Sequence, residues 1–107
     1  MKHFNCIYEG QKFIIKFSRL ARTRMEDVGM MEEAIFGSVV AAIQEVNKLE
    51  GDSQFAIVDK EAMSTTVCGM TVIDDVKLVT VITVVELSRT ILREGQRVIN
   101  LGEKIRV

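Results

Sequence analysis

The stretch Val76–Leu87, VKLVTVITVVEL, decides the fold prediction. Its twelve residues contain no Gly, Pro or Asn, and Val, Ile and Thr predominate. β-Branched side chains pack well on a pleated surface, and such a run is typical of a strand covered on both faces. We therefore expect Val76–Leu87 to be a central strand, with the tail of the chain or another subunit over its second face.

Two further strand signals precede this stretch. Ser53–Val58 alternates between apolar and other residues, and Met63–Ile73 is a second apolar run in which Gly69 marks a bend or bulge. The turns at Asp59-Lys60 and Asp74-Asp75 are short. Short turns join antiparallel neighbours, so we expect the three strands to form an antiparallel meander.

Two helices are predicted upstream of the meander. Arg19–Val28 follows Ser18, which can cap a helix, and its Leu20 and Met25 can face inward. Met31–Lys48 carries apolar residues at i, i+4, i+8, i+11 and i+12, which is the stripe of an amphipathic helix. We expect this second helix to lie across the sheet.

The two ends of the chain give hairpin and helix signals. His3–Tyr8 and Lys12–Phe17 flank a connection that contains Gly10, which favours a β-hairpin. The tail after Ser88 fits a helix over residues 88–101, but Glu94-Gly-Gln-Arg97 echoes the sequence of the first turn and supports a second hairpin. We favour the helix, followed by a short strand at Lys104–Val107.

The predicted fold class is a single α+β domain over residues 1–107. It consists of an N-terminal β-hairpin, two helices, a three-stranded antiparallel meander and a C-terminal helix or hairpin. With 48% hydrophobic residues the chain can bury a real core, and the net charge of −1 argues against a surface devoted to nucleic acid. The start of the chain has no signal-peptide pattern, and no apolar run is long enough to span a membrane, so we expect a cytoplasmic protein.

Little in the sequence points to catalysis. Cys6 and Cys68 lack metal-ligand spacing, and we interpret them as reduced, buried thiols. His3 is the only histidine and has no partner for a nucleophilic mechanism in the sequence around it. We therefore expect no catalytic residue, no metal and no cofactor.

Basic residues are the binding candidates, and a solvated surface is the alternative for each group. One group is a dense run around the start of the first helix, and the other is spaced i, i+4, i+8, so that it would form one stripe on a helix. Both could contact phosphates or an acidic partner. The candidates are Lys16, Arg19, Arg22, Arg24, Arg89, Arg93 and Arg97.

Four segments carry a resemblance to a known family: residues 18–33, 55–60, 74–79 and 81–84. They resemble a small bacterial domain family of uncharacterised function in the RelE/ParE toxin-like superfamily. That family's pattern has a strand, His-Ala-x-x-Arg-Met, a break with Gly, a second helix and a sheet that ends in a Thr-Val strand. Arg24 and Met25 keep their places in this pattern, but Leu20 stands where the His is expected. The resemblance implies a RelE-like scaffold without the chemistry of that His.

The sequence and the resemblance together predict a small cytosolic bacterial or mobile-element protein that binds another protein without catalysis, in a toxin–antitoxin setting. One alternative is a RelE-type RNA endonuclease toxin acting on RNA or at the ribosome, with Lys16, Arg24, Arg89 and Arg93 on phosphates. Another is a phage-type inhibitor of a host or defence protein. A homodimer, or larger homo-oligomer, built by edge pairing of sheets is a further expectation.

Overall fold

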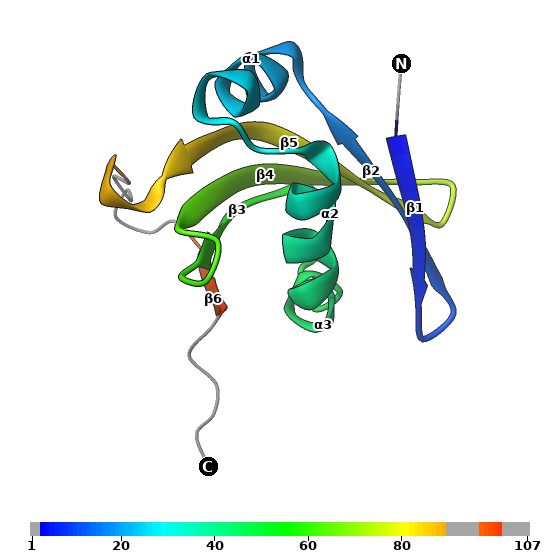
Figure 1. Ribbon diagram of the computed structural model, residues 1–107. Helices are drawn as coiled ribbons and strands as arrows, with labels where there is room; N and C mark the ends of the chain where they lie inside the picture. The colour runs from blue at the N-terminus through cyan, green and yellow to red at the C-terminus, as the bar shows by residue number, and fades with distance from the viewer. Residues whose placement is uncertain (1–2, 90–96, 102–107) are drawn as a thin grey trace.

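The computed structural model describes residues 3–89 and 97–101, with only the backbone of Arg89 (Figure 1). In this part of the chain, strands and short helices follow each other as a hairpin, three helices, three long strands, one 3-10 turn and a last strand. The elements are β1 (His3–Tyr8), β2 (Gln11–Phe17), α1 (Arg19–Val28), α2 (Glu32–Ala41), α3 (Ile43–Val46), β3 (Ser53–Asp59), β4 (Ser64–Ile73), β5 (Val76–Glu86), η1 (Leu87–Arg89) and β6 (Arg97–Leu101).

All six described strands form one mixed sheet in the order β1-β2-β5-β4-β3-β6. β2 lies parallel to β5, with Phe13 beside Lys77 and Phe17 beside Val81, and β6 lies parallel to β3. The predicted layout of a hairpin, two helices, a separate three-stranded meander and a C-terminal helix or hairpin is therefore wrong. Parallel strands are not joined by a tight turn, so no local sequence signal marks their pairing.

The C-terminal prediction is corrected where the structure describes it. Arg97–Leu101 is an edge strand that extends the sheet beside β3, with Ile99 next to Ile57. The predicted helix over residues 88–101 does not reach this segment, because Arg97–Leu101 is extended. Residues 90–96 and the predicted strand Lys104–Val107 lie outside the described residues.

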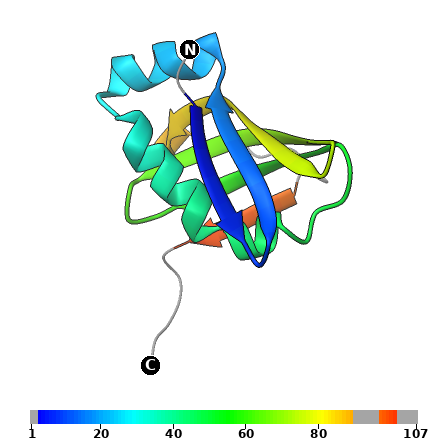
Figure 2. The same ribbon diagram turned by 90° about the vertical axis from the view of Figure 1, so that its right-hand side faces the viewer.

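One face of the sheet, called the helix face below, packs against the helices. Figure 2 looks along the sheet from the β1 end and shows the helices to one side of it. Burying one Val, Leu, Ile, Phe or Met side chain stabilises a fold by about 1.5–3 kcal/mol. The core on the helix face includes Phe13, Ile15, Phe17, Ala21, Met25, Ile35, Val39, Val46, Phe55, Ile57, Cys68, Met70, Val79, Val81 and Val84.

The central strand β5 is buried less evenly than its composition indicates. Val79, Val81 and Val84 are buried on the helix face, whereas Leu78 and Thr80 are half-buried on the opposite side, called the outer face below. No helix of the described residues lies over the outer face (Figures 1 and 2). Cover by another subunit stays a prediction.

A bulge interrupts the ladder between β4 and β5. Val67 pairs with Thr83 and Cys68 pairs with Val81, so Ile82 is an extra residue on β5. Gly69 was expected to mark the bulge, but Gly69 itself pairs regularly with Thr80. The irregularity lies on the partner strand instead, close to the start of α1.

The predicted helix Met31–Lys48 is divided into two. α2 ends at Ala41, and Ala42 adopts φ −96° and ψ 4° before α3 begins. Met31 occupies the N-cap position of α2 without a side-chain capping bond and is 66% exposed, so it is not part of the predicted apolar stripe. Leu20, expected to face inward from α1, is 49% exposed, and Ala21 is buried in its place.

Within the described residues, no helix is long and apolar enough to span a membrane.

Candidate functional site

Apolar side chains gather at one end of the outer face. Ile14 pairs with Leu78 between β2 and β5, and Val76 pairs with Ile73 between β5 and β4. Ile7 joins the same row because Lys12 pairs with both Ile7 and Val76. We call Ile7, Ile14, Ile73, Val76 and Leu78 the outer patch.

The outer patch is exposed to a degree that is unusual for aliphatic residues. Ile7 is 74% exposed and Ile73 is 52% exposed, and the other three are half-buried. Apolar residues exposed together on one face of a sheet are typical of interaction sites in soluble proteins, and these five lie on four neighbouring strands. The outer patch is therefore our leading candidate for a functional surface.

Two turns are tied together at the end of the outer patch. The Gln11 side chain donates a hydrogen bond from Nε2 to the Asp75 carbonyl oxygen over 2.7 Å. Glu9 and Gly10 of the first turn have φ of 50° and 82°, and Asp74 and Asp75 of the second have φ of 50° and 66°. The bond joins the first residue of β2 to the β4–β5 turn and so links the strand ends that carry Ile7 and Ile73.

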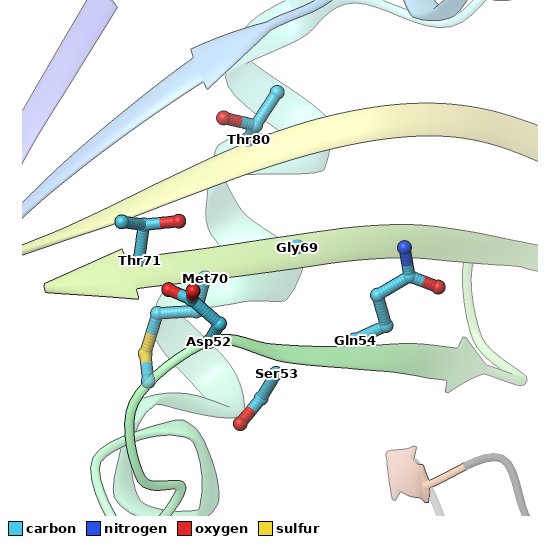
Figure 3. A pocket seen from close by; sticks show the side chains of 7 residues that line it. All are labelled: Asp52, Ser53, Gln54, Gly69, Met70, Thr71 and Thr80. Atoms are coloured by element: carbon cyan, nitrogen blue, oxygen red, sulfur yellow. The ribbon is translucent and has the colours of Figure 1, made fainter.

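A shallow hollow of about 290 Å³ lies next to the outer patch (Figure 3). Its floor is Gly69, which lies between Gln54 and Thr80 in neighbouring strands. A Cβ at Gly69 would meet only Ile82 Cδ1 at 3.5 Å and the Ser53 carbonyl at 3.9 Å, both ordinary contacts. A residue with a Cβ would therefore fit at position 69 without a steric clash. Because glycine has no side chain, the outer face is hollow at this position.

The lining of this hollow offers polar groups but no arrangement typical of a catalytic site. Figure 3 shows the Gln54 amide and the Thr71 and Thr80 hydroxyls around Gly69, with Asp52 on the adjoining loop. These groups can donate and accept hydrogen bonds, but the lining includes no His, Cys or Lys. The hollow therefore adds polar contacts to the rim of the outer patch.

A second hollow, of about 340 Å³, lies at the other end of β5. It is bordered by Met30 after α1, by Met63 before β4 and by Leu87 of η1. Met63 has φ of 55°, and its carbonyl accepts a hydrogen bond from the Leu87 N–H over 2.9 Å. The described lining of this hollow is mainly apolar, with Glu86 as its one acidic residue.

The predicted basic residues do not form one site. Arg19 and Arg24 are exposed on α1, while Arg22 bonds Glu32 over 3.1 Å and so links α1 to α2. Lys16 is half-buried on the outer face of β2.

Of the second basic group, Arg89, Arg93 and Arg97, the structure describes only Arg97 in full. Arg97 is exposed on β6, at the opposite end of the strand order from β1 and β2. The side chain of Arg89 and the whole of Arg93 lie outside the described residues. A helix through Arg97 would place the i, i+4, i+8 arginines in one stripe, but Arg97 begins a strand.

The thiols and the tyrosine are poor nucleophiles and bases. Burial raises the pKa of the Cys68 thiol, and it also raises the pKa of the half-buried Cys6. Desolvation, with a smaller effect of the neighbouring Glu9, raises the pKa of Tyr8. Because the thiolate is the reactive form of cysteine, both cysteines stay in their unreactive protonated form near pH 7. Both are free of disulfides.

A hydrogen-bonded carboxylate joins α2 to the β3–β4 turn. Asp59 accepts a bond from Ser38 Oγ at 2.8 Å on one oxygen, and from the N–H groups of Glu61 and Ala62, each at 3.1 Å, on the other. Sequence reasoning missed Ser38, although an Asp at the start of a turn is a known signal for bonds to the next backbone N–H groups. All the bonds of Asp59 are structural.

Two hydroxyls next to this carboxylate have no partner. Ser64 Oγ and Thr66 Oγ1 are buried on the helix face of β4 without a hydrogen bond to any described group. Ser64 pairs with Asp59, and Thr66 pairs with Ile57. Because a buried hydroxyl without a partner costs free energy, we treat these groups as a local weakness of the core.

Groupings of three or more potential metal ligands do not occur among the described residues. No family model, curated protein or solved structure matches this chain. The resemblance to RelE/ParE toxin-like domains therefore stays a prediction from the sequence.

Proposed function

We propose that this chain is a protein-interaction domain that binds another protein through the outer patch and acts without catalysis. The observation that carries the proposal is the exposure of the patch, above all of Ile7 and Ile73, which are 74% and 52% exposed. Covering this surface would remove apolar area from water, at about 25 cal/mol for each Å². A flat apolar surface suits a folded protein better than a small molecule, which binds in concave sites.

The surroundings of the patch indicate the chemistry of the partner. Lys12 is exposed between Ile7 and Val76, and Asp74 and Asp75 are exposed in the turn beyond Ile73. A polar rim of both signs around an apolar centre is typical of protein interfaces. The partner should present an apolar patch of its own with a carboxylate opposite Lys12.

The setting of this interaction rests on the sequence resemblance to RelE/ParE toxin-like domains. The proposal places it in the bacterial cytoplasm, in keeping with two free cysteines. Regulation of a toxin, or inhibition of a host or defence protein by a mobile element, would each use such a surface. An RNA endonuclease is not proposed, because the candidate basic residues whose side chains are described are spread over α1, β2 and β6.

The experiment compares proteins captured by three tagged variants after chemical cross-linking in cells that express the chain. Ile73→Lys and Leu78→Lys place a charge in the outer patch, and Met31→Lys is the matched control at an exposed apolar residue of the helix layer. We expect a partner that cross-links to the wild type and to Met31→Lys, and at least tenfold less to the two patch variants.

The captured protein is then purified and titrated against the same variants by calorimetry. The proposal predicts a Kd raised at least tenfold for Ile73→Lys and unchanged for Met31→Lys. Circular dichroism melting checks that each variant is folded. Equal capture by all variants, or no captured protein at all, would contradict the proposal.

A further inference from the structure

The first strand leaves one of its two edges open. β1 pairs only with β2 among the described residues, and it is the first strand of the sheet. The β1–β2 turn has two residues, Glu9 and Gly10, so Tyr8 and Gln11 form the closing hydrogen-bonded pair. Bonded and non-bonded pairs alternate along an antiparallel ladder. The backbone N–H and C=O groups of His3, Asn5 and Ile7 therefore point away from β2, along the open edge.

Within His3–Tyr8, the open edge carries none of the usual protective features. Natural edge strands carry Lys, Pro or a bulge, or are very short, because an open edge is a template for another strand. β1 has six residues, HFNCIY, and none of them is Lys, Pro, Asp or Glu. Its pairing with β2 runs without a register shift from His3 to Tyr8. β6 at the opposite end of the sheet, by contrast, begins with Arg97.

Half-buried aromatic side chains gather beside the same edge. Phe4 and Tyr8 project from β1 onto the helix face, and Phe36 of α2 stacks on Phe4 with ring centroids 4.7 Å apart. The chain has six aromatic residues, and the other three, Phe13, Phe17 and Phe55, are no more than 2% exposed. Aromatic residues are enriched in interfaces. The backbone groups of this edge therefore face outward, and half-buried aromatic side chains lie beside them.

We propose that β1 pairs antiparallel with β1 of a second copy of this chain, about a two-fold axis at Asn5. In this register Asn5 lies opposite Asn5 of the copy, and His3 lies opposite Ile7. Each outward N–H and C=O of these residues then has a partner, as the alternation of an antiparallel ladder requires. The two sheets become one continuous sheet, and the two outer patches lie on the same side of it.

The register favours a second copy over a different protein. When a strand pairs with its own copy about a two-fold axis, the central residue lies opposite itself, so a charge there would repel its own copy. The charge-free sequence of β1 avoids this conflict, and it places Phe4 opposite Cys6 of the copy on the helix face. The net charge of −1 for each chain adds little repulsion. Two-fold pairing is also the commonest symmetry of soluble dimers.

The first test measures the oligomeric state by sedimentation velocity over a range of concentrations. The wild type should form a dimer, and Asn5→Lys should be monomeric at concentrations where the wild type is dimeric, because two lysines would face each other. Thr71→Lys, at an exposed position of the interior strand β4, is the matched control and should stay dimeric. Mixing Asn5→Lys with Asn5→Glu should restore association as a heterodimer.

The second test reads the register with disulfides in a Cys6→Ser background. Directly opposite residues of a bonded pair have Cα atoms about 5.5 Å apart, within the range of a disulfide. Asn5→Cys should form a covalent dimer on mild oxidation. Ile7→Cys, which is on the same face of the same strand, should do so only in combination with His3→Cys.

Three results would overturn the inference. They are a monomeric wild type at all concentrations, a dimer that persists in Asn5→Lys, and equal cross-linking of Asn5→Cys and Ile7→Cys. Ile73→Lys, which tests the partner surface, lies away from β1 and should leave the dimer intact. The dimer and the proposed partner binding can therefore fail independently.

Discussion

The Ser18 hydroxyl donates a hydrogen bond to the Ile82 carbonyl oxygen over 2.7 Å, although 64 positions separate the two residues in the sequence. Ser18 Oγ in turn accepts a bond from the Ala21 N–H at 3.0 Å and so caps the start of α1. Ile82 is the extra residue of the β5 bulge, which frees its carbonyl from the ladder. One side chain thus ends β2, begins α1 and anchors both to the central strand.

Replacing Ser18 by Ala should destabilise the fold by about 1–2 kcal/mol, since the change removes both a helix cap and a bond to a bulge carbonyl. Chemical denaturation followed by circular dichroism measures this change. Thr23→Ala is the control, because Thr23 is exposed within α1 and also begins a Thr-x-x-Glu sequence that could cap a helix. If Thr23→Ala lowered the free energy of unfolding as much as Ser18→Ala, the Ser18–Ile82 bond would contribute no extra stability.

Replacing Thr66 by Val should stabilise the fold by about 1 kcal/mol, because it exchanges a buried hydroxyl without a partner for a methyl group of the same shape. The thermal midpoint and the denaturation midpoint should both rise. Ser38→Ala provides the contrast, since it removes a bond of 2.8 Å to Asp59 and should destabilise the fold. A destabilised Thr66→Val would mean that the hydroxyl has a partner, such as a buried water.

The Cys68 thiol should make stability depend on pH in the alkaline range. Burial raises its pKa above the ordinary value of 9.0, so the folded protein keeps the proton that the unfolded chain releases. The resulting stabilisation is complete below pH 9 and is lost as the pH rises further, by up to about 1.4 kcal/mol for each pH unit.

Denaturation of the wild type and of Cys68→Ala at several pH values between 7 and 10.5 measures this dependence. The free energy of unfolding should fall more steeply in the wild type above pH 9. Tyr8, whose pKa is also raised, is present in both proteins and cancels in the difference. Parallel curves for the two proteins would contradict the prediction.

Local elements were predictable because their signals are local. Gly10 indicates the first turn, Ser18 indicates the start of a helix, and the composition of Val76–Glu86 indicates a strand. The layout was not predictable in this way, because the pairing of β2 with β5 joins Lys12 to Val76 without any turn between them. The break at Ala42 was missed because the apolar spacing continues through it.

The candidate surface was missed for a related reason. An apolar residue in a strand is normally counted toward the core, and Ile7 and Ile73 are indistinguishable from core residues by type. Their exposure follows only from the strand order, which places both on the side away from the helices. The arginines, by contrast, are recognised as binding candidates from the sequence. Their separation in space could not be predicted, because it depends on where the fold places α1 and β6.

The parallel pairing of β2 with β5 has a consequence for how the chain folds during synthesis. The hairpin β1–β2 leaves the ribosome before its neighbour β5, because 64 positions separate the paired residues Lys12 and Val76. Contacts between such distant residues slow folding, and strands exposed in the meantime invite association. Nascent hairpins on neighbouring ribosomes could thus meet through β1 before either sheet is complete, which would favour assembly between chains read from one message.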